Sequence, residues 1–358
     1  MPNQLRINGV LDPHVHLRGM EWAHKGTFAS ETAAALAGGY WAVLDMPNTT
    51  PATLTPHALA HKLAEISANA VCDWGVYYGG AAAGNWDDYS AALYAQVCGL
   101  KLYNNETTGA LTISDQATRA QHYAGWTSAL PIAVHAEEAT VDDILALVRQ
   151  YRRFTHFCHV SSAYEIRALT AAKEAGLPIS IGVCPHHLWL TRDDLPHLGG
   201  FGMMKPELET AADRDALWYA LQAGIVDVVE SDHAPHLISE KASESPPFGV
   251  PGLETTLPLL LTAVHEGRLT LEQVTALVAD NPRRIFGIAC PPETYTVLDL
   301  DADYTLDRAD LHTLCGWSPF EGLRLRARVA QTWCRGVLVY DGERVLVQPG
   351  FGQRVQRA

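Results

Sequence analysis

The sequence predicts an α/β protein, a (β/α)8 barrel of the TIM type with a small β-rich C-terminal appendage. Short β-prone runs alternate with helix-patterned stretches from residue 10 to about 265, and this alternation is typical of a parallel sheet. There are eight such runs, the number that closes a barrel. The pattern changes after residue 289, where short β-prone pieces separated by Pro and Gly follow one another.

Each predicted strand is a short apolar or β-branched run, and the runs cover residues 10–17, 40–48, 72–80, 99–105, 130–137, 154–160, 177–185 and 226–235. Several of the stretches between them begin with Ser or Thr and several end in Gly, as helices do. These predicted helices include residues 27–39, 55–70, 140–153, 162–176, 251–267 and 269–287.

Two structural units are expected, a barrel over residues 1–289 and an appendage over residues 290–358. The appendage contains the β-prone pieces 294–300, 325–336 and 337–350. Within the last piece, the pair Asp341-Gly342 is typical of a hairpin turn.

The composition excludes several classes of function. A formal charge of -14 over 358 residues disfavours nucleic acid or an anionic membrane as the main partner. A small anionic substrate stays compatible, because one arginine can hold a carboxylate. Seven scattered cysteines indicate reduced thiols, so we expect a cytoplasmic protein. We expect neither a signal peptide nor a membrane span, since no long apolar run occurs.

Two histidines, His14 and His16, end the first predicted strand. Because side chains alternate along a strand, both imidazoles project to the same face. Arg18, two residues further on, is expected on that side as well. The pattern fits either a pair of half-buried polar residues or a bidentate metal clamp, so the rest of the chain has to decide.

Further candidate ligands lie in or at the ends of other predicted strands. Taken singly, His135 and His159 fit satisfied core histidines, and Asp232 fits a turn cap. Lys101 is harder to explain, because a lysine among apolar neighbours is costly to bury unpaired. Together at one barrel mouth, these residues predict a metal centre, and imidazole and carboxylate ligands suit zinc. They are too many for one catalytic zinc, whereas two metals would need an anionic bridge.

The chain resembles the dihydroorotases of the amidohydrolase superfamily, and most closely the dihydroorotase domain of the animal multifunctional pyrimidine-synthesis protein. The resemblance is carried by the motifs "HVHLR", "MPNTTP", "KLY", "HAE", "CHV", "PHHL", "SDHAPH" and "PGLET", and it extends to "PFEG" and "PGFGQ". The first of these is shared in part by the whole superfamily, whereas "HLR" together with "PNT" and "SDHAPH" is more specific.

The resemblance implies two zinc ions per chain. The first would be held by His14, His16 and Asp232, and the second by His135 and His159. Carboxylated Lys101 and a hydroxide would bridge the two ions. Asp232 would also act in catalysis, taking a proton from the hydroxide and delivering it to the leaving nitrogen.

The resemblance also implies a substrate site. Arg18, Asn48 and His236 would hold the carboxylate of dihydroorotate, although Asn48 also fits a turn former. The loop 104–112, with Thr107 and Thr108, would close over the substrate, or it is an ordinary solvated loop. Backbone groups near Pro251 and Gly252 would meet the pyrimidine ring.

The sequence departs from the family pattern in four places. The usual "HLREPG" reads "HLRGME" here, and Gly182 stands where a glutamate is frequent. Glu230 stands where a small residue is usual, and Lys205 where an arginine is common. Glu230 is two residues before Asp232, so we expect it to perturb that base. These departures concern substrate positioning rather than the class of reaction.

We therefore predict a zinc-dependent dihydroorotase that interconverts (S)-dihydroorotate and N-carbamoyl-L-aspartate in de novo pyrimidine biosynthesis. One alternative is a cyclic-amide hydrolase acting on allantoin or a hydantoin, for which Arg18 would have no carboxylate to bind. Another is a catalytically silent homologue that supports aspartate transcarbamoylase. A homodimer, and association with aspartate transcarbamoylase, are expectations from the family alone.

Overall fold

The centre of the molecule is an eight-stranded parallel sheet in which each strand pairs with the next along the chain. The computed structural model describes residues 3–106 and 111–358. The strands are β2 (Leu11–Val15), β3 (Ala42–Asp45), β4 (Asp73–Gly79), β5 (Gly99–Tyr103), β6 (Ile132–His135), β7 (Thr155–Phe157), β8 (Ile179–Val183) and β9 (Val228–Val229). Every residue of these strands is buried, as expected for a parallel sheet covered on both faces.

The sheet closes on itself through the segment that follows β9. The backbone N–H of His16 donates to the carbonyl of His233 at 2.7 Å, and Val15 forms a parallel bridge with His233. The predicted eight-stranded barrel is therefore confirmed. All its strands run in one direction, so their carboxyl ends open at a single mouth.

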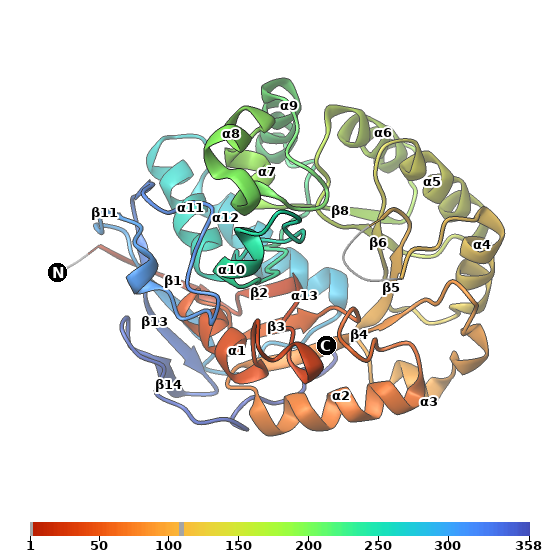
Figure 1. The fold of residues 1–358 in the computed structure, drawn as a ribbon, viewed down its shortest axis with the longest axis horizontal. Coiled ribbons are helices and arrows are strands. Elements are labelled where there is room, and N and C mark those ends of the chain that lie inside the picture. Colours follow the sequence, from red (N-terminus) through yellow and green to blue (C-terminus); the bar gives the residue numbers. More distant parts are fainter. Residues whose placement is uncertain (1–2, 107–110) are drawn as a thin grey trace.

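Helices surround the strands, although some of the shorter ones are drawn over the middle of the barrel (Figure 1). They are α1 (Phe28–Ala37), α2 (Pro56–Asn69), α3 (Ala91–Tyr94), α4 (Gln116–Gly125), α5 (Ala139–Tyr151), α6 (Ala163–Glu174), α7 (Pro185–Trp189), α8 (Leu195–Leu198), α9 (Ala211–Gln222), α10 (Ile238–Lys241), α11 (Leu253–His265), α12 (Leu271–Thr275) and α13 (Asn281–Phe286). Thr27, Thr55 and Ser162 accept backbone N–H groups at the starts of α1, α2 and α6. These are the helix starts that the sequence predicts.

An antiparallel sheet packs beside the barrel, with the strand order β1-β10-β13-β14. Its strands are β1 (Gln4–Asn8), β10 (Tyr295–Asp299), β13 (Arg328–Cys334) and β14 (Val337–Tyr340), and a separate pair consists of β11 (Tyr304–Thr305) and β12 (Arg324–Leu325). The predicted C-terminal β-rich region is confirmed. One of its strands, β1, comes from the N-terminal end of the chain, so the sheet crosses the expected boundary at residue 289. The division into two domains stays a prediction.

The predicted hairpin at Asp341-Gly342 is present. The N–H of Asp341 donates to the carbonyl of Arg344 at 3.2 Å, and Tyr340 forms an antiparallel bridge with Val345. Gly342 has a φ of 99°, a backbone conformation that glycine adopts without steric strain.

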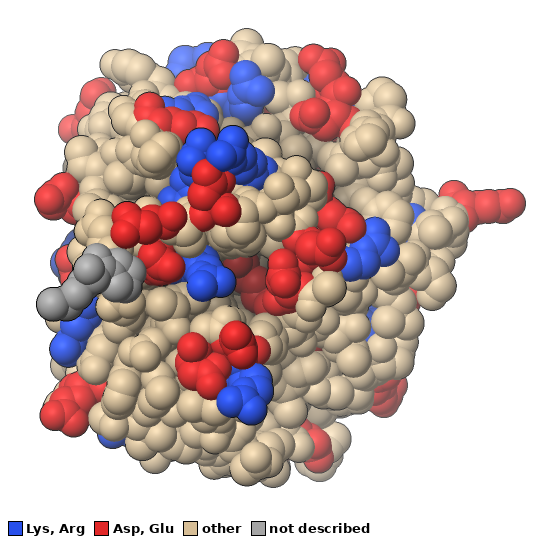
Figure 2. All heavy atoms as spheres, turned by 90° about the vertical axis from the view of Figure 1, so that its left-hand side faces the viewer, with Lys and Arg blue, Asp and Glu red and all other residues tan. Residues whose placement is uncertain are grey.

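The surface and the thiols agree with the composition. On the face shown in Figure 2, acidic and basic side chains are interspersed, and the basic ones form small groups bordered by acidic ones. All seven cysteines are free, and six of them are buried. Within residues 3–106 and 111–358, no helix combines the length and the apolar character that a bilayer crossing requires.

Candidate metal centre and active site

The structure gathers the predicted metal ligands at the mouth of the barrel. They come from five strands or from the residues directly after them, and each side chain is nearly inaccessible to solvent. The exposed fractions are His14 1%, His16 8%, Lys101 0%, His135 1%, His159 2% and Asp232 8%. These residues are far apart in the sequence, and the structure brings them together at one place.

His14, His16 and Asp232 form one group. The Nε2 atoms of His14 and His16 lie 3.2 and 3.0 Å from the same oxygen, Asp232 Oδ1. Burial, and then the charge of Lys101, lower the pKa of His14 to about 4, although Asp232 and Glu230 act in the opposite direction. His14 is therefore neutral at neutral pH and has a ring lone pair available for a cation.

His135 and His159 form a second group next to the first. His135 Nδ1 and His159 Nε2 face each other at 3.1 Å, and the rings of His14 and His159 are 5.1 Å apart. Burial, followed by the neighbouring His135, holds the pKa of His159 well below its usual value. His159 Nδ1 is buried without a hydrogen-bond partner among the described residues. The two buried imidazoles thus bring ring nitrogens close together, an arrangement that could also serve a metal cation.

Lys101 interacts electrostatically with histidines of both groups. Its amine is fully buried, and it influences the pKa of both His14 and His135. The hydrogen-bond partner of Nζ in the structure is Cys158 Sγ, at 3.3 Å. A thiol compensates a buried ammonium poorly, whereas a carboxylated amine at this position would be an anionic ligand between two metals. The donor set therefore fits a binuclear centre.

The predicted carboxylate-binding residues lie directly beside the first group. Arg18 is buried, its Nε donates to the carbonyl of Pro235 at 3.0 Å, and its Nη2 lies 2.9 Å from His236 Nε2. Asn48 Oδ1 is 2.6 Å from His16 Nδ1. Arg18 reaches this place differently from the prediction, because β2 ends at Val15 and Arg18 has a φ of 61°. A turn rather than strand alternation directs its side chain.

His236 lies between two cations, since Lys25 Nζ approaches its Nδ1 to 3.2 Å on the side opposite Arg18. Burial, and then the charges of Arg18 and Lys25, hold the pKa of His236 well below its usual value. The ring is therefore neutral, and Arg18 and Lys25 provide the positive charge of this wall.

A small hollow opens over these residues, lined by His16, Arg18, Asn48, Lys205, Asp232, Ala234, Phe248 and Gly249. Positive charge from Arg18 and Lys205 and the carboxylate of Asp232 thus face the same space. The predicted residues Pro251 and Gly252 line a neighbouring hollow with His233 and Trp317, and their contact with a substrate stays a prediction. Thr107 and Thr108 lie outside the described residues.

Three residues that the structure places at the site are not among the predicted ligands and substrate-binding residues, although the sequence marks two of them, Lys205 and Glu230, as departures from the family pattern. Lys205 lines the hollow, and the sequence marks it only as a departure from an arginine. Glu137 Oε1 lies 2.8 Å from His135 Nε2. The sequence feature that could have indicated Glu137 is its position two residues after the predicted ligand His135. Glu230 contacts both histidine groups. Burial raises the pKa of Glu230, but His156 and His14 lower it overall to below its usual range.

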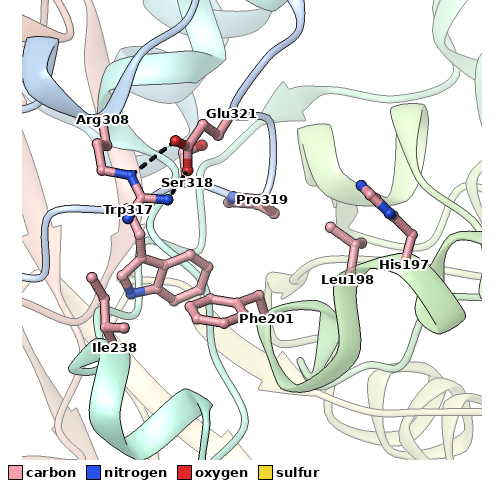
Figure 3. Close-up of a pocket in the computed structure, with 9 residues that line it drawn as sticks. All are labelled: His197, Leu198, Phe201, Ile238, Arg308, Trp317, Ser318, Pro319 and Glu321. Atoms are coloured by element: carbon pink, nitrogen blue, oxygen red, sulfur yellow. Dashed lines mark hydrogen bonds and ion pairs between the residues drawn. The ribbon is translucent and has the colours of Figure 1, made fainter.

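A larger hollow lies elsewhere on the surface (Figure 3). It is lined by His197, Leu198, Phe201, Ile238, Arg308, Trp317, Ser318, Pro319 and Glu321. Trp317 separates it from the site, since its Nε1 donates to the carbonyl of His236 at 2.7 Å. None of the predicted ligands lines this hollow, so the chemistry belongs to the smaller one.

Another group of potential ligand atoms lies in Cys184, His186 and His187. These residues come from one short segment, so their closeness in space follows from their closeness in the sequence.

Comparison with solved structures defines the class of protein. An L-hydantoinase (dihydropyrimidinase) from Arthrobacter aurescens superposes with a TM-score of 0.93 at 25% identity, covering 99% of this chain and 89% of that one. An inactive dihydroorotase-like domain of a CAD-like multifunctional protein from Chaetomium thermophilum superposes with a TM-score of 0.82 at 23% identity, covering 98% and 99%. The fold and the gathered ligands define a barrel enzyme of the amidohydrolase class.

Relatives in sequence define the family. A dihydroorotase of Halobacterium salinarum is 37% identical over 97% of this chain and 89% of its own length. The multifunctional protein CAD of Squalus acanthias is 42% identical over 98% of this chain, and pyr1-3 of Dictyostelium discoideum is 38% identical over 97%. The chain belongs to the dihydroorotase family. The prediction of that family is confirmed.

The chain spans 16% of the length of each of the two multifunctional relatives. No protein-family model matches the chain.

Proposed function

We propose that the chain is a zinc-dependent dihydroorotase, which hydrolyses (S)-dihydroorotate reversibly to N-carbamoyl-L-aspartate in de novo pyrimidine biosynthesis. The observation that carries this proposal is the place of Arg18. A buried guanidinium lines the same hollow as the ligands His16 and Asp232. An anion held there would have its ring next to the metal centre. Hydrolysis of a neutral cyclic amide would not need this charge.

We assign the metal ligands as the sequence predicts. His14, His16 and Asp232 would hold one zinc, His135 and His159 the other, and carboxylated Lys101 together with a hydroxide would bridge them. When bound, the two ions would polarise the ring amide carbonyl and lower the pKa of water from about 15.7 towards about 7. The converging Nε2, Nδ1 and carboxylate atoms, and the unpartnered His159 Nδ1, support this assignment.

Asp232 is the proposed general base and acid. Its Oδ1 lies against His14 and His16, and the residue also lines the hollow. It would accept the proton of the attacking hydroxide and return it to the ring nitrogen that leaves. Its backbone φ of 44° is unusual for a residue other than glycine, and such strain persists where the surroundings fix it.

Substrate orientation is assigned to the wall of the hollow. Arg18 would pair with the substrate carboxylate, with Asn48 and neutral His236 as further hydrogen-bonding groups. Thr107 and Thr108 would contact the substrate from the loop 104–112, which would act as a lid, and the backbone near Pro251 and Gly252 would meet the ring. Lys205 adds a second cation to the wall.

The alternative with an observation in its favour is hydrolysis of a hydantoin or allantoin, because the L-hydantoinase structure is so similar. The catalytically silent alternative would be expected to lack ligands, whereas all six are present here. We further propose a cytoplasmic homodimer that associates with aspartate transcarbamoylase. Free buried thiols and the two multifunctional relatives support the location and the association, respectively.

Steady-state turnover by the purified chain tests the proposal, with dihydroorotate, hydantoin and allantoin as separate substrates. We expect a clear preference for dihydroorotate, about two zinc ions per chain, and activity that is lost in Lys101→Ala and Asp232→Asn. Preference for hydantoin or allantoin would reject the proposed substrate. Less than about one zinc per chain after careful purification would favour the silent homologue.

A further inference from the structure

Glu230 connects the two histidine groups although it belongs to neither. It follows β9 directly, is 0% exposed, and uses both carboxylate oxygens. Its Oε1 accepts the backbone N–H of His159 at 2.6 Å and lies 3.6 Å from His14 Nδ1. Its Oε2 is 3.1 Å from His156 Nε2. One buried carboxylate therefore touches a predicted ligand of each metal.

The space for this carboxylate exists because residue 182, on the neighbouring strand β8, is glycine. A Cβ at Gly182 would lie 2.5 Å from Glu230 Oε1 and 2.9 Å from His156 Nε2. Real Cβ atoms do not approach other atoms so closely, so a side chain at this position would displace the carboxylate. The two departures from the family pattern, at positions 182 and 230, are thus one local arrangement.

The contacts have a definite effect on the two histidines. His14 Nδ1 is buried without a hydrogen-bond partner among the described residues, and Glu230 Oε1 is the carboxylate oxygen it faces. A proton on Nδ1 directed at this carboxylate leaves the lone pair on Nε2, the atom that faces Asp232. His159 has a φ of 39°, and strained backbone of this kind needs support from its surroundings. The hydrogen bond to Glu230 provides such support.

We propose that Glu230 is a positioning residue, which orients His14 and His159 so that both present a ring nitrogen to the metals. The inference rests on the proposed binuclear centre of the dihydroorotase. Carboxylates that orient metal-bound histidines typically raise metal affinity by 10–100-fold. Glu230 differs from the usual case because one carboxylate serves ligands of both metals, through a side chain in one case and a backbone N–H in the other.

The test measures zinc affinity by competition with a chelator, in the full chain and in E230Q, which has nearly the same shape. We expect binding weakened by about 10–100-fold in E230Q and an altered visible absorption spectrum of the cobalt-loaded protein. The exposed Glu272 provides the matched control, since E272Q should leave both readouts unchanged. Thermal unfolding of the metal-free proteins is followed in parallel, because an effect confined to folding would lower that midpoint and leave the spectrum unchanged.

A relocated carboxylate provides the rescue. In the double variant G182E/E230S the carboxylate enters the same space from β8, and we expect zinc binding at least about tenfold tighter than in E230S alone. If the single variants fail to fold, this double variant decides, since a folded double variant with weak zinc binding would overturn the proposal.

Two further results would overturn the positioning role. One is zinc affinity and a cobalt spectrum in E230Q equal to those of the parent. The other is a third bound metal that is lost only in E230Q, because Glu230 would then be a ligand, together with His14 and Cys158. Failure of the proposed function can be told apart from failure of the positioning role. A parent chain that does not turn over dihydroorotate, but whose zinc affinity drops in E230Q, contradicts only the substrate.

Discussion

Replacing Arg18 with methionine would separate recognition of the substrate carboxylate from the chemistry at the metals. Methionine retains an unbranched apolar chain like the methylene part of arginine, at a position that is 2% exposed. The substitution therefore removes mainly the guanidinium group. Burial lowers the pKa of Arg18 to about 10, so the group is charged at neutral pH. Two of its five N–H donors are directed at Pro235 and His236, and among the described residues no hydrogen bond is recorded for the others, which could hold an anion.

The expected loss follows from these contacts. Hydrogen bonds to charged groups contribute about 1.5–3 kcal/mol in a site of this kind. A loss of about 3 kcal/mol corresponds to a roughly 150-fold lower kcat/KM for dihydroorotate. The assay is steady-state hydrolysis, with dihydrouracil as a second substrate that has the same ring and no carboxylate.

For dihydrouracil we expect R18M to change kcat/KM by less than about threefold, since no ion pair is lost. The zinc content should equal that of the parent, because Arg18 is not a ligand. Equal losses on both substrates would refute the reasoning and would make Arg18 a structural residue. Unchanged kcat/KM for dihydroorotate would refute it as well.

Three further changes test other parts of the structure. Lys62 forms a buried ion pair with Asp45 at 2.6 Å, so K62M should lower the free energy of unfolding by about 3–5 kcal/mol in urea titration. The exposed Arg308 provides the control, since R308M should change it by less than about 1 kcal/mol, and equal effects would contradict the argument. Burial raises the pKa of Glu254 from 4.5 to about 8. The folded state thus binds this proton more tightly, and the resulting stability is complete below about pH 4.5 and is lost as the pH rises through about 8. E254Q should flatten the pH dependence of unfolding by up to about 5 kcal/mol, and identical curves for parent and variant would reject this. K101M should retain neither zinc by elemental analysis, yet its metal-free form should be no less stable, because no carboxylate of the described residues forms an ion pair with the buried amine; a zinc-loaded K101M would contradict the bridging role.

The sequence was sufficient for the barrel and for most of the site, because both follow from local patterns. Alternating β-prone and helical stretches define parallel strands, and parallel strands bring their carboxyl ends together. A histidine such as His135, at the end of its run, therefore falls beside His159 without any knowledge of distances. The start of α1 at Thr27 is predictable for a similar reason, since a cap depends only on its neighbours.

Other features depend on which segments become neighbours in space. Glu230 contacts His159 in the space that the missing side chain of Gly182 leaves. No local sequence pattern around these three residues indicates that contact. Lys205 enters the hollow from an irregular segment whose course no periodicity predicts. Arg18 is a mixed case, because its direction was predicted from strand alternation and is produced by a turn.

The pairing of β1 with the last sheet bears on how the chain is made. Gln4 pairs with Asp299, so strand β1 has no partner until the chain as far as β10 has left the ribosome. At synthesis rates of about 5–20 residues per second, that interval is roughly 15–60 s. An unpaired strand can form non-native pairings during this time. Chaperones that bind nascent chains would therefore act on this protein over that interval.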